Sequence, residues 1–126
     1  MTTAKQYHSL CRWTFHAGKG GFVPSAIRPQ WASDKLSVVE IINLINTKIR
    51  PRLPDNIELG FELHYDTEID EKTAPAVADA LVNAKMYLAM ITPGLHSHLG
   101  YGGPASMDPA ERENATKLSF GTVDIA

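Results

Sequence analysis

The chain has 126 residues, of which 44% are hydrophobic and 21% are charged, and its formal net charge is −2. This length corresponds to one domain of about 100–200 residues, and the composition is that of a globular protein. The small net charge argues against nucleic acid or an anionic membrane as a partner. No apolar run reaches the ~18 residues of a membrane span, and the single cysteine, Cys11, cannot form an intramolecular disulfide. We therefore expect a cytoplasmic protein that binds neither nucleic acid nor membranes.

The first of three similar passages predicts a strand, a long loop and a helix. Residues 7–15 are rich in aromatic and apolar side chains, which predicts a buried strand. After a glycine-rich loop, residues 36–49 carry an apolar stripe at helical spacing. The stripe consists of Val38, Ile41, Ile42, Ile45 and Ile49. Ser33 or Ser37 could cap the start of this helix, and Pro51 ends it.

The second passage has the clearest pattern. Over residues 57–64, apolar side chains alternate with glutamate, glycine and histidine, which is the period of a half-buried strand. A helix is predicted over residues 74–84, with Pro75 in its first turn. One side of this helix consists of Val77, Ala80, Leu81 and Ala84.

The third passage again predicts a strand followed by a helix. The continuous apolar run over residues 85–92 predicts a strand that is covered on both faces. Further on, Asp108 and Pro109 suit the N-cap and the first position of a helix, and Glu111 follows at capping-box spacing. The helix continues along a side formed by Ala115, Leu118, Thr122 and Ile125.

Strand and helix thus alternate three times without a hairpin signal, which predicts an α/β fold with a parallel sheet. Three β/α units form an incomplete sheet, and eight would form a (β/α)8 TIM barrel. The sequence stops at Ala126 within the third predicted helix. We therefore expect residues 1–126 to be a parallel βαβαβα fragment, the N-terminal three units of such a barrel.

Histidines gather where the predicted strands end. His16, His64, His96 and His98 lie at or just beyond these ends. Functional groups collect at the carboxyl ends of strands in parallel α/β sheets. Glu62 and His64 lie on the side of the second strand opposite its apolar row, where a buried carboxylate needs a partner. A histidine beside a carboxylate can transfer protons near neutral pH.

Structural roles compete with these functional ones. A histidine at a strand end can simply hydrogen-bond within the fold, and His96 with His98 can belong to a solvated loop. Trp13 can be a core residue, and Glu62 can pair with an arginine of a barrel interior. Arg50 is expected on the solvated surface.

Taken together, these segments resemble the N-terminal third of xylose isomerase and of the xylose-isomerase-like TIM-barrel family. The resemblance extends over residues 7–126, as order and spacing more than as identity. It rests on Arg12–Phe15, similar to the family's first strand, Phe61–Asp66, similar to the second, Met90–Thr92, similar to the third, and Asp108–Arg112, similar to the third helix.

The resemblance implies a sugar isomerase of carbohydrate metabolism that interconverts aldoses and ketoses. Such enzymes open the cyclic sugar and move a hydride between C1 and C2 with two divalent metal ions, usually Mg, Mn or Co. The family's metal ligands and catalytic lysine come from later strands, so no metal ligand is identifiable in this chain. We therefore expect the chain alone to be an inactive fragment, and the parent enzyme to form a homo-oligomer.

The resemblance also assigns roles to individual residues. His64 takes the position of the histidine that assists ring opening, and Trp13 that of the tryptophan lining the sugar pocket. Thr67 stands where the family has the aspartate that orients the histidine, and Asp66 or Glu62 could take over that role. The predicted catalytic residues are His64 and Asp66, and the predicted substrate-binding residues are Trp13, Glu62, Thr92 and His96.

Two other functions compete with this one. The same barrel can carry a sugar epimerase or hydrolase, because one fold hosts many reactions. The chain could instead be a non-catalytic sugar-binding domain, in which Trp13 and His64 only bind or pack. Carboxylates and histidines at the ends of further strands would indicate metal-dependent chemistry and would separate these alternatives.

Overall fold

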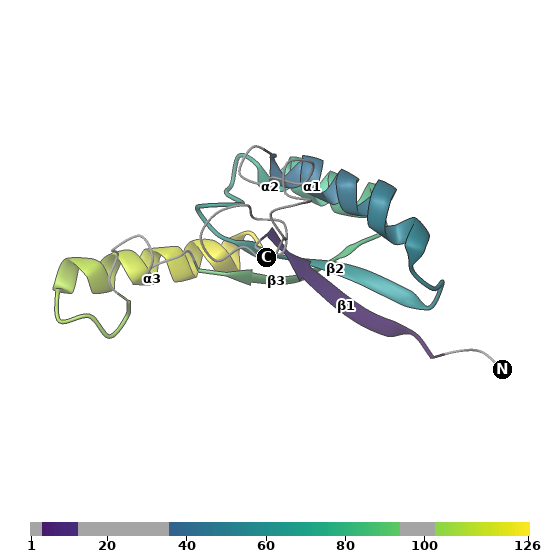
Figure 1. Ribbon diagram of the computed structural model, residues 1–126. Helices are drawn as coiled ribbons and strands as arrows, with labels where there is room; N and C mark the ends of the chain where they lie inside the picture. The colour runs from purple at the N-terminus through teal and green to yellow at the C-terminus, as the bar shows by residue number, and fades with distance from the viewer. Residues whose placement is uncertain (1–3, 13–35, 94–102) are drawn as a thin grey trace, which may run out of the picture. The chain divides into compact units, whose positions relative to one another are not determined.

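The computed structural model describes residues 4–12, 36–93 and 103–126. Strands and helices alternate along the chain (Figure 1). The elements are β1 (Gln6–Cys11), α1 (Val38–Leu44), the π-helical segment η4 (Ile45–Ile49), the 3-10 segment η5 (Arg50–Arg52), β2 (Ile57–His64), α2 (Ala74–Asn83), β3 (Tyr87–Thr92) and α3 (Pro109–Asp124). The predicted α/β class is therefore confirmed. None of the helices in the described ranges is long and apolar enough to cross a membrane.

The strands form one parallel sheet in the order β1-β2-β3. In the ladder between β1 and β2, Gln6 is the partner of Ile57 and Cys11 is the partner of Glu62. Paired residues of a sheet project to the same face, so this register decides which side chains of β1 and β2 are neighbours. The predicted parallel sheet is confirmed.

β1 differs from the predicted strand in length and in burial. It ends at Cys11, and residues 13–15, which were expected to continue it, lie outside the described residues. Gln6 to Ser9 are exposed, so the predicted burial of this strand is wrong. In the described part of the chain β1 has a neighbouring strand only on its β2 side, and its polar side chains can therefore face water.

The chain packs as two compact units. Unit 1 consists of Met1–Glu62 and Ala76–Ala89, and unit 2 consists of Leu63–Pro75 and Met90–Ala126.

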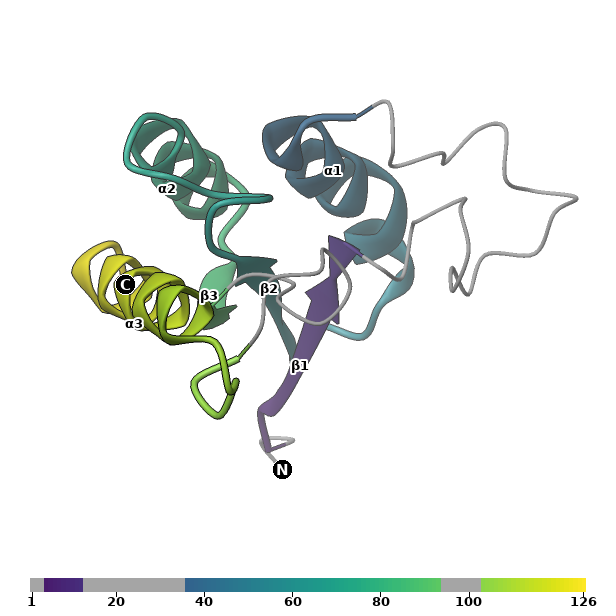
Figure 2. The same ribbon diagram turned by 90° about the vertical axis from the view of Figure 1, so that its left-hand side faces the viewer.

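In unit 1, α1 and α2 lie side by side over one face of β1 and β2 (Figure 2). The buried side chains of this layer are Val38, Ile41, Ile42, Ile45, Leu59, Phe61, Val77, Ala80, Leu81 and Ala84. Burying one large apolar side chain contributes about 1.5–3 kcal/mol, so this layer is a main source of stability. Both predicted helical stripes are confirmed, although Ile49 at the end of the first stripe is only half-buried.

β2 alternates as predicted. Leu59, Phe61 and Leu63 are 3%, 0% and 0% exposed. Glu62 and His64, on the opposite side of the strand, are half-buried. The apolar row therefore faces the buried layer, and the polar row belongs to the other face of the sheet.

Ser37 starts α1 with a capping box. Its hydroxyl accepts a hydrogen bond from the Glu40 N–H at 3.3 Å, and the Glu40 carboxylate accepts one from the Ser37 N–H at 2.7 Å. The helix predicted over residues 36–49 is α-helical only as far as Leu44. It continues as the π-helical and 3-10 segments, and Pro51 lies in the last of these.

Arg50 caps the end of α2 and is not the solvated surface residue that was predicted. Its Nη2 donates hydrogen bonds to the carbonyls of Ala84 at 2.8 Å and Lys85 at 3.1 Å. Its Nε donates to Asn46 Oδ1 at 3.1 Å. Lys85 has a φ of 50°, the left-handed conformation that commonly closes a helix. The half-buried guanidinium therefore binds carbonyls that the helix end leaves without partners.

In unit 2, buried side chains come from the end of β2, the turn after it and α3. Leu63 and Ala115 are 0% exposed and Ile69 is 5% exposed. On α3, Ala115 and Thr122 are buried, and Leu118 and Ile125 are half-buried. The hydroxyl of the buried Thr122 donates to the Leu118 carbonyl at 2.7 Å, which satisfies it within the helix.

α3 starts at the predicted place. The Asp108 carboxylate accepts a hydrogen bond from the Ala110 N–H at 2.8 Å, and Pro109 is the first helical residue. The glutamate of the predicted capping box is linked to the N-cap through a serine. The Ser106 hydroxyl donates to the Glu111 carboxylate and accepts from the Asp108 N–H at 3.1 Å.

β3 is not covered on both faces, contrary to the prediction from its apolar sequence. Its residues are exposed or half-buried, and Met90 is 48% exposed. Like β1, this strand has a neighbour on one side only in the described part of the sheet. An apolar run suits a strand with cover on both faces, but the cover depends on neighbours that the run itself does not specify.

We expect Arg50→Ala to lower the free energy of unfolding by about 1–3 kcal/mol, because carbonyls at the end of α2 lose a charged donor. Arg52→Ala is the matched control. Arg52 is exposed and binds only the carbonyl of Lys48 in its own segment among the contacts described, so its loss should cost less than about 0.5 kcal/mol. Urea denaturation of both variants makes the comparison, and equal losses would contradict the assignment of Arg50 as the cap.

Candidate functional site

The carboxyl ends of β2 and β3 adjoin in unit 2. The Tyr65 N–H, one residue beyond the end of β2, donates to the carbonyl of Thr92 at 2.9 Å. The Thr92 hydroxyl lies 3.5 Å from the carbonyl of Leu63. His64 and Thr92, two of the predicted site residues, are therefore at neighbouring strand ends, where parallel α/β sheets carry their functional groups.

The ring of His64 is held by a carboxylate. Its Nδ1 lies 2.9 Å from Glu68 Oε2, and the same oxygen accepts a hydrogen bond from the backbone N–H of His64 at 2.9 Å. The His64 side chain is 19% exposed and that of Glu68 is 7% exposed, so water screens the pair little. A carboxylate at Nδ1 selects the neutral tautomer with its proton on Nδ1. In that tautomer Nε2 carries the lone pair that can accept a proton.

A tight turn places Glu68 against His64. The Glu68 N–H donates to the His64 carbonyl at 2.9 Å, and the Asp66 N–H donates to the Ile69 carbonyl at 2.9 Å. Tyr65 and Ile69 form an isolated β-bridge across the turn. Asp66 has a φ of 69°, a left-handed conformation that aspartate tolerates better than most residues.

The carboxylate at Nδ1 belongs to Glu68, and not to Asp66 or Glu62, the two residues that the sequence offered in place of the aspartate missing at Thr67. Sequence analysis did not select Glu68 for this role. The signal is weak, because a spacing of four residues brings two side chains together only if the chain reverses between them. Here the reversal depends on the left-handed backbone of Asp66.

Tyr65 makes the second polar contact beside His64. Its hydroxyl donates to the Glu71 carboxylate. This hydrogen bond is the main cause that raises the pKa of Tyr65 to about 12, and it lowers the pKa of Glu71. The ring lies against α3 at Gly121, where a Cβ would overlap the ring carbon Cζ and the hydroxyl oxygen.

The remaining predicted site residues are not part of this group. Glu62 belongs to unit 1, where its carboxylate accepts a hydrogen bond from the Ser9 hydroxyl. The alternative in which Glu62 pairs with an arginine stays a prediction. Trp13 and His96 lie outside the described residues, as do His16 and His98. Unit 2 thus brings together His64, Asp66 and Thr92, and it adds Glu68 and Tyr65, which sequence reasoning did not select.

The polar face of unit 1 has its own contacts. Lys5 Nζ lies 2.6 Å from Glu58 Oε1, and this ion pair raises the pKa of Lys5 and lowers that of Glu58. The rings of Tyr7 and Tyr87 meet edge to face, with 5.9 Å between their centroids. Tyr87 also covers Gly60, where a Cβ would come within 2.5 Å of the ring. Each of these contacts joins two side chains or a ring and a backbone position within unit 1.

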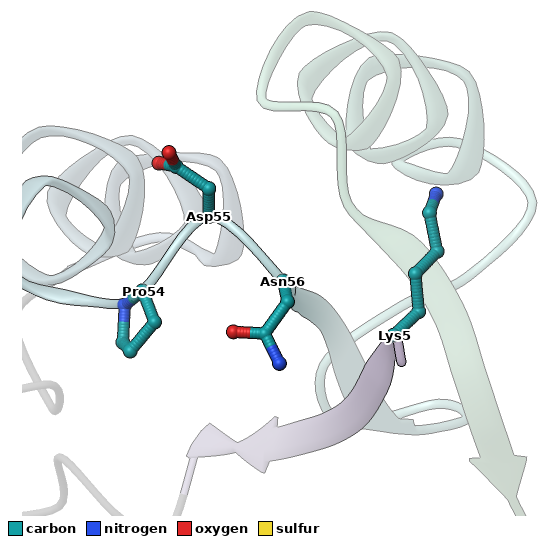
Figure 3. A pocket seen from close by; sticks show the side chains of 4 residues that line it. All are labelled: Lys5, Pro54, Asp55 and Asn56. Carbon is teal, nitrogen blue, oxygen red and sulfur yellow. The ribbon is translucent and has the colours of Figure 1, made fainter. Parts of the chain in front are cut away.

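An open pocket of about 470 Å³ lies at the amino end of β2, the end opposite His64 (Figure 3). Lys5, Pro54, Asp55 and Asn56 line it. Lys5 is paired with Glu58, and the Asn56 amide donates to the carbonyl of Ala4 at 3.0 Å. Two of its polar side chains therefore already have partners, which makes this pocket a weaker candidate than the strand ends.

Within the described residues, no group of three or more histidine, cysteine, aspartate or glutamate side chains could hold a metal ion. The His64–Glu68 pair has the groups that proton transfer requires.

No protein-family model, no curated protein and no solved structure matches the chain. The resemblance to xylose isomerases therefore stays a prediction, and the geometry at the strand ends carries the functional argument.

The left-handed backbone of Asp66 predicts how substitutions at this position change the free energy of unfolding. We expect Asp66→Val to lower the free energy of unfolding by about 1–2 kcal/mol, the cost of a left-handed conformation for a residue with a Cβ that tolerates it poorly. Asp66→Gly should retain wild-type stability, because glycine adopts this conformation freely. Chemical denaturation measures both, and equal destabilisation would show that the carboxylate, and not the backbone, matters.

The contact between Tyr65 and Glu71 predicts an alkaline transition. The pKa of Tyr65 is raised from about 10 to about 12 by the hydrogen bond to Glu71. Its contribution to stability is therefore complete below pH ~10 and is lost as the pH rises through ~12. Tyr65→Phe should lack this part of the stability profile. Thermal unfolding between neutral and alkaline pH tests the difference, and identical profiles for both proteins would contradict it.

Proposed function

We propose that the chain is part of a sugar isomerase of the xylose-isomerase-like class, and that its three β/α units belong to a (β/α)8 barrel. One observation carries the proposal, the hydrogen bond from His64 Nδ1 to the Glu68 carboxylate at the carboxyl end of β2. The parallel sheet supports it, because active sites of such barrels lie at the carboxyl ends of the strands. The substrate is a small cyclic sugar, and the site residues are His64 with Glu68, flanked by Thr92.

In the proposed reaction, His64 acts as the base for ring opening. Nε2 takes the proton from the anomeric hydroxyl while the C1–O5 bond breaks and a carbonyl forms at C1. The electron pair goes to the ring oxygen, which takes up a proton from water, and the imidazolium returns its proton to the hydroxide so formed, which restores the neutral ring and the water. Glu68 keeps the proton of the neutral ring on Nδ1 and stabilises the imidazolium that forms. The later hydride shift would need the divalent metal ions that the resemblance implies, with ligands from later strands.

A non-catalytic sugar-binding domain is the second candidate, and the dual role of Glu68 favours it. The oxygen that contacts Nδ1 also accepts the backbone N–H of His64, so the same carboxylate closes the turn. A histidine whose partner serves the turn can be purely structural. The two functions differ in whether His64 accelerates a reaction.

Ring opening is measured by the interconversion of sugar anomers, which needs no metal ion. The chain alone is expected to be inactive as an isomerase, but we expect it to accelerate the ring-opening step, seen as mutarotation of a pure anomer of an aldose and followed by polarimetry. His64→Gln should remove this acceleration, with a loss of about 10²-fold, the lower range of general base catalysis. Glu68→Gln should cause a smaller loss, because an uncharged partner stabilises the imidazolium less.

His8→Gln is the matched control, since His8 is exposed at the start of the sheet in β1. This variant should retain the full rate. An equal rate in wild type and His64→Gln would contradict the proposed base and favour the binding domain. Formation of ketose by this chain alone with added magnesium would contradict the expectation that the hydride shift needs residues of later strands.

A further inference from the structure

Tyr65, the residue that follows His64, contacts several elements of unit 2. Its backbone N–H binds the carbonyl of Thr92 at the end of β3, and it forms a bridge with Ile69 across the turn. Its hydroxyl binds Glu71, beyond the far side of the turn, and its ring lies on α3 at Gly121. The side chain therefore spans the turn that carries Glu68 and rests on the helix.

α3 has a glycine where the Tyr65 ring contacts it, and this glycine lowers the stability of the helix. A Cβ at position 121 would overlap Cζ and the hydroxyl oxygen of Tyr65, so the ring can rest there only on a glycine. Glycine in the interior of a helix is unfavourable relative to alanine. α3 thus carries a residue that weakens it at the place where Tyr65 makes contact.

The turn links this contact to the candidate base. Tyr65 is joined to His64 by a peptide bond, and the turn that it closes with Ile69 contains Glu68. Tyr65 lies on one side of the turn and Ile69 on the other, and the ring of Tyr65 contacts α3 at Gly121. The distance of 2.9 Å between His64 Nδ1 and Glu68 Oε2 depends on both sides staying in place.

We propose that Tyr65 is a positioning residue, which holds the His64–Glu68 pair together through both its ring contact with α3 at Gly121 and the hydrogen bond of its hydroxyl to Glu71. The role of the His64–Glu68 pair in a reaction rests on the proposed function. The effect of Tyr65 on the geometry of this pair does not. The hydroxyl of Tyr65 is no candidate base. Its pKa of about 12 keeps it protonated at neutral pH, as a donor to Glu71.

Nitrogen NMR of the His64 ring tests the coupling directly. The shifts of Nδ1 and Nε2 report the tautomer, and the exchange of the Nδ1 proton with water reports the hydrogen bond to Glu68. Gly121→Ala pushes the Tyr65 ring off the helix, and Tyr65→Phe removes only the bond to Glu71. We expect the proton to exchange roughly tenfold faster in both variants, the change that about 1.4 kcal/mol produces.

Gly103→Ala is the matched control, because a Cβ there has no neighbour within 4 Å. It should leave the His64 ring unchanged, and the amide of the buried Phe61 serves as an internal reference for global opening in every variant. Unchanged nitrogen shifts and an unchanged exchange rate of the His64 ring in Tyr65→Phe would overturn the proposal. This outcome is decisive even if Gly121→Ala does not fold. A failure of the mutarotation assay would leave this result standing, since the NMR signals do not depend on activity.

Discussion

Because successive side chains of a strand point to opposite faces, the burial of Leu59 and Phe61 also decides where Glu62 and His64 lie. A shift of β2 by one residue would bring carboxylates into the apolar layer and expose the phenyl ring. An unpaired buried charge costs several kcal/mol, so this shifted register is strongly disfavoured. The apolar row of β2 therefore fixes the side of the strand on which the candidate base projects, before any contact of its ring is made.

The polar groups of β2 obtain their partners in two different ways. Glu58 and Glu62 bind Lys5 and Ser9 of the neighbouring chain segment, 53 residues away in each case. These contacts require the parallel ladder between β1 and β2. His64 instead binds a carboxylate only four residues further along the chain, so its partner is supplied by the adjacent turn. The pair can therefore keep its geometry without help from β1.

Local signals made the helices and the middle strand predictable, and the absence of such signals explains what was missed. Ser37 caps α1 because a hydroxyl and a glutamate three residues on carry their partners with them. The burial of β1 and β3 depends on neighbours that their own sequences do not encode, and Met90 is exposed despite the apolar run around it. The candidate site was predictable only in part. His64 followed from the alternation of β2, whereas Glu68 required knowledge of the left-handed backbone at Asp66.

The two roles of Glu68 reinforce each other chemically. An imidazole held only through Nδ1 could rotate about its side-chain bonds, but here the acceptor is itself fixed by the backbone N–H of His64. The ring of His64 is therefore held in one orientation, which would reduce the reorganisation required by the proposed proton transfer. The structural and the catalytic interpretations thus share one geometry. The two interpretations differ at Nε2. A catalytic role requires that the lone pair of this nitrogen accepts a proton from a substrate, whereas a structural role does not.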